Sequence, residues 1–381
     1  MAVKLIHTAD VHIGAKLTFL GDKAEEQRAQ IRQTFTNLVA AAISEGADLF
    51  LIAGDLFDSP FPSAVNIGFV ITEIGKLIQA GIWVGIIPGN HDRLEPGSVF
   101  TRSDFSQLNA TRFKLFNKTG GEAWAIPELE LVVYGVPTVH QKTKKSPLTG
   151  INLKLAQQGK KGPMDPKYKI GLVHGSLDIN QDDTNAPISK SEISKLVLNY
   201  LAVGDWHGAM EITQSPHPAW YSGSPEVIHS DQHNSGHYLL VEITESDTKV
   251  TPKHIGHRKT KRLEVDLAKY KDINALIKEL DSFADPNVIL SVSLGGSKNV
   301  GMDINLNELT ALLSPKFFSV RLTDKSELEI TKQQLEQYPP ELITGRYIRL
   351  LQSKKGKDPE KNRVIDKAIQ LGVKLLSKSE R

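Results

Sequence analysis

Five short apolar runs in this chain each end in side chains that carry an acid, an imidazole or an amide. The runs lead into the motifs "DVHIG", "GDLFD", "GNHD", "VHG" and "GDWHG", at residues 10–14, 54–58, 89–92, 173–175 and 204–208. A short apolar run that stops at glycine or a polar residue is typical of a buried strand. Each motif alone is weak, because an acid after glycine is common in turns. Five in succession are not explained by turns, so we expect several buried strands to end in polar groups that gather in one place.

Segments with helical periodicity lie between the first three of these apolar runs. This alternation of strands and helices implies right-handed crossovers and an α/β fold with a largely parallel sheet. In such a sheet the carboxyl ends of the strands form one rim, and ligands bind there. We expect strands over residues 3–9, 48–53, 82–87, 170–173 and 201–203, and helices over residues 25–45 and from a cap at Ser63 to residue 79.

Seven residues at this expected rim have side chains that bind divalent metal ions. Carboxylate, imidazole and amide groups suit ions of intermediate hardness, such as manganese, iron or zinc. Asp55 could bridge two ions about 4 Å apart, the geometry used for in-line displacement at phosphorus. His91 could protonate the leaving oxygen, since imidazole exchanges protons near neutral pH. The seven candidate ligands are Asp10, His12, Asp55, Asn90, His174, Asp205 and His207.

In this order the five motifs resemble the calcineurin-like metallophosphoesterase superfamily. Within it, "HTADVHIG", "AGDLFDSPFPS" and "YSGSPE" are similar to the nuclease subunit of the SbcC–SbcD (MRE-type) DNA repair complex. The resemblance implies a β-sandwich core flanked by helices, with His91 as the catalytic histidine. It also implies two metal sites that share Asp55. One would be completed by Asp10, His12 and His207, and the other by Asn90, His174 and the position of Asp205.

Asp205 departs from the family pattern, which usually reads Gly-His-x-His where this chain has Gly204-Asp205-Trp206-His207. A carboxylate could still bind the second ion, and it would favour manganese or magnesium over softer ions. Alternatively, Asp205 could orient a neighbouring histidine and leave one site weak. Trp206 could cover the site, but the alternation of side chains along a strand favours packing into the core behind it.

Asp58 is the second catalytic candidate beside His91. It falls where some family members carry a histidine that helps to move the phosphate, while bacterial members often have Asp. Asp58 could instead form a hydrogen bond to a metal ligand, or it could only cap the following turn. These two simpler readings carry equal weight.

The pattern changes near residues 257–261. Beyond this point the order strand, helix (273–283), strand (288–294), helix (305–313), strand (317–322) indicates a small α+β domain. A Lys-rich linker and a final helix over residues 360–378 follow, with apolar residues striped along one side. We predict a nuclease domain over 1–258, a capping domain over 259–343, and a basic linker with a C-terminal helical tail over 344–381. The resemblance implies that this tail docks on an SMC-like ATPase.

The charge of the chain is uneven although its net charge is only +2. Residues 141–169 hold eight lysines and one acid, and residues 346–381 hold eleven basic residues and four acids. Each stretch could be a solvated surface or a contact surface for a polyanion such as DNA. The chain has no cysteine and no long apolar run, so we expect a cytoplasmic protein without membrane contact.

Together these observations predict a hydrolase that cleaves DNA phosphodiester bonds, as an exonuclease or endonuclease in double-strand-break repair. We expect two divalent metal ions, Mn²⁺ in the first place and Mg²⁺ as the alternative. One rival function is a phosphoesterase acting on a small nucleotide. Another is a catalytically silent subunit that binds DNA or the ATPase. The sequence leaves open the polarity of cleavage and whether the chain forms a homodimer.

Overall fold

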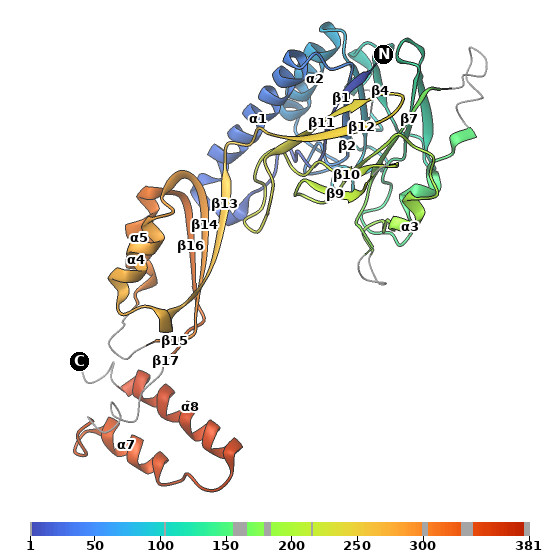
Figure 1. Ribbon diagram of the computed structural model, residues 1–381. Coiled ribbons are helices and arrows are strands. Elements are labelled where there is room, and N and C mark those ends of the chain that lie inside the picture. The colour runs from blue at the N-terminus through green and yellow to red at the C-terminus, as the bar shows by residue number, and fades with distance from the viewer. Residues whose placement is uncertain are drawn as a thin grey trace. The chain divides into compact units, whose positions relative to one another are not determined.

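The structure is a computed structural model of the chain (Figure 1), and its described residues are 2–102, 104–154, 166–178, 184–214, 216–298, 304–328 and 338–376. The chain divides into two compact units, Met1–Thr260 and Lys261–Arg381. Each unit is described by itself. Among the described helices, none is both long and apolar enough to cross a bilayer.

The first sheet of the N-terminal unit has six strands with a parallel centre. Parallel pairing joins β1 to β2, β2 to β3 and β3 to β4, while β11 and β12 add antiparallel strands beside β1. The strands β1, β2 and β3 are almost entirely buried, as expected for apolar runs at the centre of a sheet. In sheet order the strands are β12 (Thr248–His254), β11 (His237–Ile243), β1 (Val3–Thr8), β2 (Leu49–Ala53), β3 (Trp83–Ile87) and β4 (Phe113–Leu115).

The second sheet also has six strands. Its parallel centre runs β6, β7, β8, β10, and the antiparallel strands β5 and β9 close its edges. In sheet order the strands are β5 (Glu122–Ile126), β6 (Leu131–Gly135), β7 (Tyr168–His174), β8 (Tyr200–Gly204), β10 (Ala219–Tyr221) and β9 (Met210–Thr213).

The two sheets pack face to face as a sandwich. Alternation along β8 shows the two sides: Tyr200 and Ala202 join the core between the sheets, whereas Leu201 and Val203 face a second apolar cluster on the outside. The helices α1 (Ala24–Ser44) and α2 (Ala64–Gln79) lie together along one side of the sandwich (Figure 1). The short helix α3 (Lys190–Ile193) begins with the predicted capping box of Ser189 and Glu192. The α/β sandwich flanked by helices is therefore confirmed.

The second unit begins with a small α+β fold. Its sheet has the order β13-β14-β16, and its core joins strand residues such as Leu290 to helix residues such as Leu276 and Leu313. The strand–helix order expected from the sequence is observed. The elements are β13 (Lys259–Asp266), α4 (Ile273–Asp281), β14 (Asp285–Gly295), β15 (Ser297–Lys298), α5 (Leu306–Leu313), β16 (Phe317–Asp324) and β17 (Glu327–Leu328).

Two helices end the described chain, α7 (Ile343–Gln352) and α8 (Pro359–Leu376). Helix α7 occupies a segment that was expected to be a linker, so the basic linker shrinks to residues 353–358. The reason is that α7 has an apolar side despite its arginines: Ile348 is buried together with Ile369 and Val373 of α8. The predicted end of the final helix, residues 377–378, lies outside the described residues.

Short 3-10 helices complete the secondary structure of the described chain. They lie in the connections between the longer elements. Their bounds are Thr18–Lys23, Asp104–Gln107, Pro127–Leu129, Pro147–Gly150, Leu267–Lys269 and Ser314–Lys316.

Candidate metal centre

All seven predicted ligands lie at the carboxyl ends of strands from the two sheets. Those after β1, β2 and β3 belong to the first sheet; in the second sheet, His174 is the last residue of β7, and Asp205 and His207 follow β8. The loops are tied to one another by backbone hydrogen bonds. Asp10 N–H donates to the Gly54 carbonyl at 3.1 Å, and His12 N–H donates to the Asp55 carbonyl at 3.0 Å. The facing rims of the sandwich therefore hold the site.

Four of the seven residues have a left-handed backbone. The φ angles are +53° at Asp10, +51° at His12, +51° at Asp55 and +106° at Asp205. For a residue with a Cβ atom this region costs roughly 1–2 kcal/mol, and such conformations gather at functional sites. The strain is retained here because the turns aim all four side chains into one space.

Glycine allows the loops to approach this closely. A Cβ atom on Gly89 would lie 2.2 Å from Asp55 Oδ1, and one on Gly54, whose φ is +90°, would lie 2.4 Å from His174 Nδ1. Any side chain at either position would push a candidate ligand out of place.

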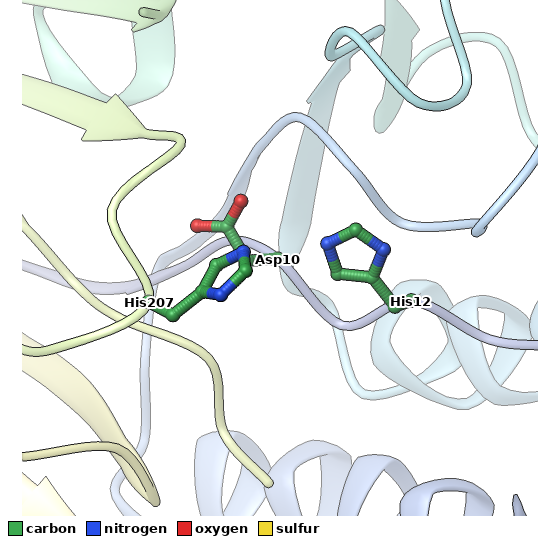
Figure 2. A group of neighbouring side chains, drawn as sticks. All are labelled: Asp10, His12 and His207. Carbon is green, nitrogen blue, oxygen red and sulfur yellow. The ribbon is translucent and has the colours of Figure 1, made fainter. Parts of the chain in front are cut away.

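The first group of ligand atoms comprises Asp10, His12 and His207, whose donor atoms lie within 4.8 Å of one another. Figure 2 shows these side chains converging from two distant segments. The His12 and His207 rings are 5.5 Å apart between centroids, nearly perpendicular to each other. The structure therefore brings together three of the four residues predicted for the first ion, and Asp55 is adjacent.

The second group of ligand atoms comprises Asp10, Asp55 and His174. Asn90 Oδ1 lies 3.2 Å from His174 Nε2, and Asp205 Oδ1 lies 3.7 Å from the same nitrogen. All four residues predicted for the second ion therefore meet around His174. Asp10, predicted for one ion only, is close to both groups.

Asp55 lies between the two groups. Its Oδ2 atom is 3.6 Å from His12 Nε2 and 3.5 Å from His174 Nε2. Its other oxygen, Oδ1, accepts the His91 backbone N–H at 2.8 Å. A carboxylate oxygen placed between two imidazoles is the arrangement expected of a bridging ligand.

The Nδ1 hydrogen bonds of the two histidines point their Nε2 atoms into the site. His12 Nδ1 is 3.0 Å from the Asp58 carboxylate, and His174 Nδ1 is 2.8 Å from the Ala53 carbonyl. Carboxylates and carbonyls only accept, so each Nδ1 carries a proton, and each Nε2 would offer its lone pair to a bound ion. Within the described chain, the buried His12 Nε2 has no hydrogen-bond partner. These residues fit a divalent ion, because inward-facing oxygen and nitrogen lone pairs need a positive charge between them.

The electrostatics of the site suit a divalent ion. Burial, reinforced by nearby Asp55, raises the pKa of Asp10 to about 8. Burial alone would lower the pKa of His174, but the carboxylates of Asp55, Asp10 and Asp205 outweigh it and raise that pKa to about 9. Burial and the neighbouring His12 lower the pKa of His207 to about 3, so His207 is a neutral imidazole. A bound cation would take the place of protons on Asp10 and His174.

The two catalytic candidates lie beside the first group. His91 has a 45% exposed side chain, and its ring packs edge-on against His12 with centroids 4.7 Å apart. Asp58 Oδ1 is 3.8 Å from His91 Nδ1, in addition to its hydrogen bond with His12. Of the interpretations left open for Asp58, this geometry favours a hydrogen bond that orients His12.

Two residues differ from, or add to, the sequence interpretation. Trp206 was expected in the core, but its side chain is 54% exposed, because strand β8 ends at Gly204 and alternation ends with it.

Asp92 was not considered as a site residue. It is fully buried and accepts N–H bonds from Phe57 at 3.0 Å and Gly89 at 2.7 Å, which joins the loops after β2 and β3. In the sequence, only the acid at the end of "GNHD" indicated a role for Asp92.

An α/β sandwich whose facing strand ends collect carboxylates and imidazoles is the arrangement typical of metal-dependent phosphoesterases. The sequence model of the calcineurin-like phosphoesterase family matches residues 3–229, more than half of the chain. The protein therefore belongs to that family.

One curated relative is the protein called "Uncharacterized metallophosphoesterase YhaO" of Bacillus subtilis (strain 168). It is 25% identical to this chain over 289 residues. The alignment covers 72% of this chain and 66% of the Bacillus protein, slightly less than two thirds of its length. This similarity agrees with the family and indicates no substrate.

Proposed function

We propose that the protein is a DNA phosphodiesterase, the nuclease half of an ATPase–nuclease complex for double-strand-break repair. The observation that carries the phosphodiesterase activity is Asp55 Oδ2, which lies between His12 Nε2 and His174 Nε2 with the other candidate ligands around it. Two divalent ions, Mn²⁺ in the first place and Mg²⁺ as the alternative, would supply charge for the phosphate oxygens and activate a water.

In this proposal each side chain of the site has a separate role. Asp58 keeps the His12 proton on Nδ1, and His91 stands at the open side, where it would give a proton to the leaving oxygen. His91 is held by its own backbone N–H, which donates to Asp55. One ion would be held by Asp10, His12, Asp55 and His207, and the other by Asp55, Asn90, His174 and Asp205.

DNA as the substrate is supported by the lysines that follow strand β6. Lys142, Lys144 and Lys145 are exposed, and Lys145 lines a cavity that reaches His174. Phosphate contacts of this kind supply most non-specific affinity for DNA. Lys167 contributes less, because it is engaged by Glu245. Two further lysines of this stretch, at positions 160 and 161, lie outside the described residues.

The proposal is tested by metal content together with cleavage of linear single- and double-stranded DNA in Mn²⁺. The parent should hold two ions per chain and cut DNA. The variant His91→Ala should keep both ions and its DNA affinity but cut at least a hundredfold more slowly, the usual scale of general acid catalysis. A variant that cuts as fast as the parent would remove His91 as the acid. No cleavage by the parent in Mn²⁺, Mg²⁺ or Zn²⁺ would favour the silent binding subunit.

A small nucleotide is the second candidate substrate, and a specific feature favours it. A cavity of about 180 Å³ beside His174 is lined by Thr138, His140 and Thr143 among others. This cavity is smaller than a usual ligand pocket, and it would contact only part of a nucleoside whose phosphate lies at the site. Competition decides between the two substrates: a mononucleotide hydrolysed with a higher kcat/KM than a DNA strand would replace the nuclease proposal.

Asp205 is proposed as a direct ligand of the second ion. Its carboxylate is 11% exposed and lies 3.7 Å from His174 Nε2. The variant Asp205→His, which restores the imidazole usual in the family, should raise the ratio of Zn²⁺ to Mn²⁺ affinity, because imidazole is the softer ligand. Asp205→Asn is the matched control for loss of charge. An unchanged ratio in Asp205→His, measured by metal competition, would place Asp205 outside the coordination shell.

A further inference from the structure

The exposure of Trp206 is unusual for a tryptophan of this chain. The sequence has four tryptophans. Trp83 belongs to the core between the sheets, and Trp124 and Trp220 pack against that core. Trp206 is 54% exposed. A large aromatic side chain on the surface beside a catalytic site is a candidate for ligand contact.

The chain holds Trp206 firmly in this place. On one side, the Asp205 backbone N–H donates to the Asp10 carboxylate, 3.2 Å from each oxygen. On the other side, the His207 carbonyl accepts the Ser224 N–H at 3.0 Å. The tryptophan therefore stands between two anchored residues. These bonds fix the backbone on both sides of Trp206.

Trp206 lies in the chain between candidate ligands of both ions. The Asp205 side chain faces His174, and the His207 side chain faces His12. Consecutive Cα atoms are 3.8 Å apart, so the backbone of Trp206 adjoins both ligands. An exposed indole at this position is a candidate contact for a group attached to a phosphate held at the site.

Two histidine rings near the candidate ligands are also exposed. The His91 side chain is 45% exposed and that of His229 is 64% exposed. The His229 ring stacks on Phe19, with centroids 5.9 Å apart. An electrostatic interaction links His229 to His207, so His229 lies near the candidate ligands. Flat rings beside a phosphate site suit nucleobases, which stack on aromatic side chains whatever their sequence.

We propose that Trp206 is a stacking platform for an unpaired nucleobase next to the phosphate at the metal centre. The substrate would then be a single strand or a frayed end, since a base within a duplex has no free face for the indole. This inference rests on the proposed nuclease function. A protein partner fits this place less well, because seating it on Trp206 would also cover the carboxylates of the metal centre.

The test compares strands that have bases with strands that lack them. Affinity is measured by fluorescence anisotropy in Mn²⁺ for a short oligothymidylate and an abasic strand of equal length. All proteins are full-length and carry His91→Ala, so that the strand survives the measurement. Trp206→Ala should weaken binding of the oligothymidylate by about fivefold or more, the scale of one stacked base. Trp206→Phe should retain affinity within about twofold, and neither variant should change binding of the abasic strand.

Two controls separate stacking from damage to the site. Metal content should be the same in parent, Trp206→Ala and Trp206→Phe, and Val197→Ala, at another exposed apolar residue, should leave affinity unchanged. The oligothymidylate should also quench a part of the tryptophan fluorescence that Trp206→Phe lacks.

Each remaining result counts against the inference. Equal affinity of the parent for both strands would overturn the stacking role alone, and so would equal affinity of parent and Trp206→Ala for the oligothymidylate. The nuclease proposal would survive either result. Lack of binding to any strand would overturn both. If Trp206→Ala retains affinity for DNA but loses a protein partner, the surface belongs to that partner.

Discussion

At the scale of single residues, Asp55 links the two halves of the site. One of its oxygens accepts the His91 N–H, and the other faces both His12 and His174. Its left-handed backbone and the absence of a side chain at Gly89 are what make this position available. The site is therefore built by backbone conformation as much as by ligand chemistry.

Asp58 provides the first prediction at this scale. Asp58→Ala should weaken metal binding roughly 10- to 100-fold, because His12 loses the acceptor that fixes its ring and tautomer. Asp58→Asn should weaken it less, since the amide oxygen still accepts from Nδ1. Titration calorimetry with Mn²⁺ measures both. Asp104→Ala, which removes a carboxylate paired with Arg102, should bind as the parent does. If Asp58→Ala binds Mn²⁺ as tightly as the parent does, Asp58 only caps the following turn.

The affinity for metal should rise with pH. The pKa of Asp10 is raised to about 8 by burial, and that of His174 to about 9 by the carboxylates that outweigh burial. Near pH 7 both groups hold protons in the metal-free protein, and an ion must displace them. Binding of Mn²⁺ should therefore be tighter at pH 8.5 than at pH 6.5 and should release protons. Calorimetry in buffers of different ionisation enthalpy counts those protons. Affinity independent of pH would contradict protonation of this cluster.

The sequence allowed the candidate residues to be predicted, but not their detailed environment. Polar residues after apolar runs indicate a shared rim, because parallel strands must end on the same side. Asp92 and Trp206 show what this pattern misses. The role of Asp92 depends on two N–H groups from different loops, and the exposure of Trp206 depends on where the strand ends. Neither is encoded in local spacing.

At the scale of elements, Gly372 of helix α8 predicts an unusual response to alanine. From the sequence it is a weak point of the helix, so alanine should stabilise α8 by about 1 kcal/mol. In the structure, a Cβ atom on Gly372 would lie 2.0 Å from the Tyr347 ring, whose hydroxyl donates to the Ala368 carbonyl at 2.6 Å. Gly372→Ala should therefore separate α7 from α8 and destabilise the pair.

Gly68 is the matched control in helix α2. It is exposed, and a Cβ atom there would meet nothing within 4 Å. Gly68→Ala should raise the stability of the first unit by about 1 kcal/mol. Hydrogen exchange of α2 and of α7–α8 measures the two variants separately. Slower hydrogen exchange of α7–α8 in Gly372→Ala would mean that the Tyr347 ring moves aside at no cost in stability.

The predictability of the elements depended on their surroundings. Strands β1, β2 and β3 were predicted within two residues at either end because they are continuous apolar runs between helices. Helix α7 was missed because its apolar residues are interrupted by basic ones and its burial depends on α8. Packing between distant segments decided the outcome there, as it did for Gly372.

At the scale of the whole molecule, helix α8 has more apolar surface than α7 covers. The stripe expected on one side is divided in the structure. Its residue Ile369 is buried against α7 together with Val373, while its residues Val364 and Leu375 are 68% and 62% exposed, as is Leu371 at 60%. The exposed three are spaced by seven and four residues, so they share one face of the helix. An exposed apolar face of this kind is a candidate interaction surface.

This face predicts where an SMC-like ATPase would dock. The triple variant Val364→Ser, Leu371→Ser and Leu375→Ser should lose association with the ATPase of the source organism in gel filtration, because burial of those side chains would drive the contact. Its metal content and DNA cleavage should equal those of the parent, since none of the three belongs to the metal centre. Leu312→Ser, at an exposed leucine of α5, is the control for general loss of surface apolarity. Association of the triple variant at parental strength would place the docking surface elsewhere, and loss of association with Leu312→Ser as well would assign it to the α+β part of the second unit.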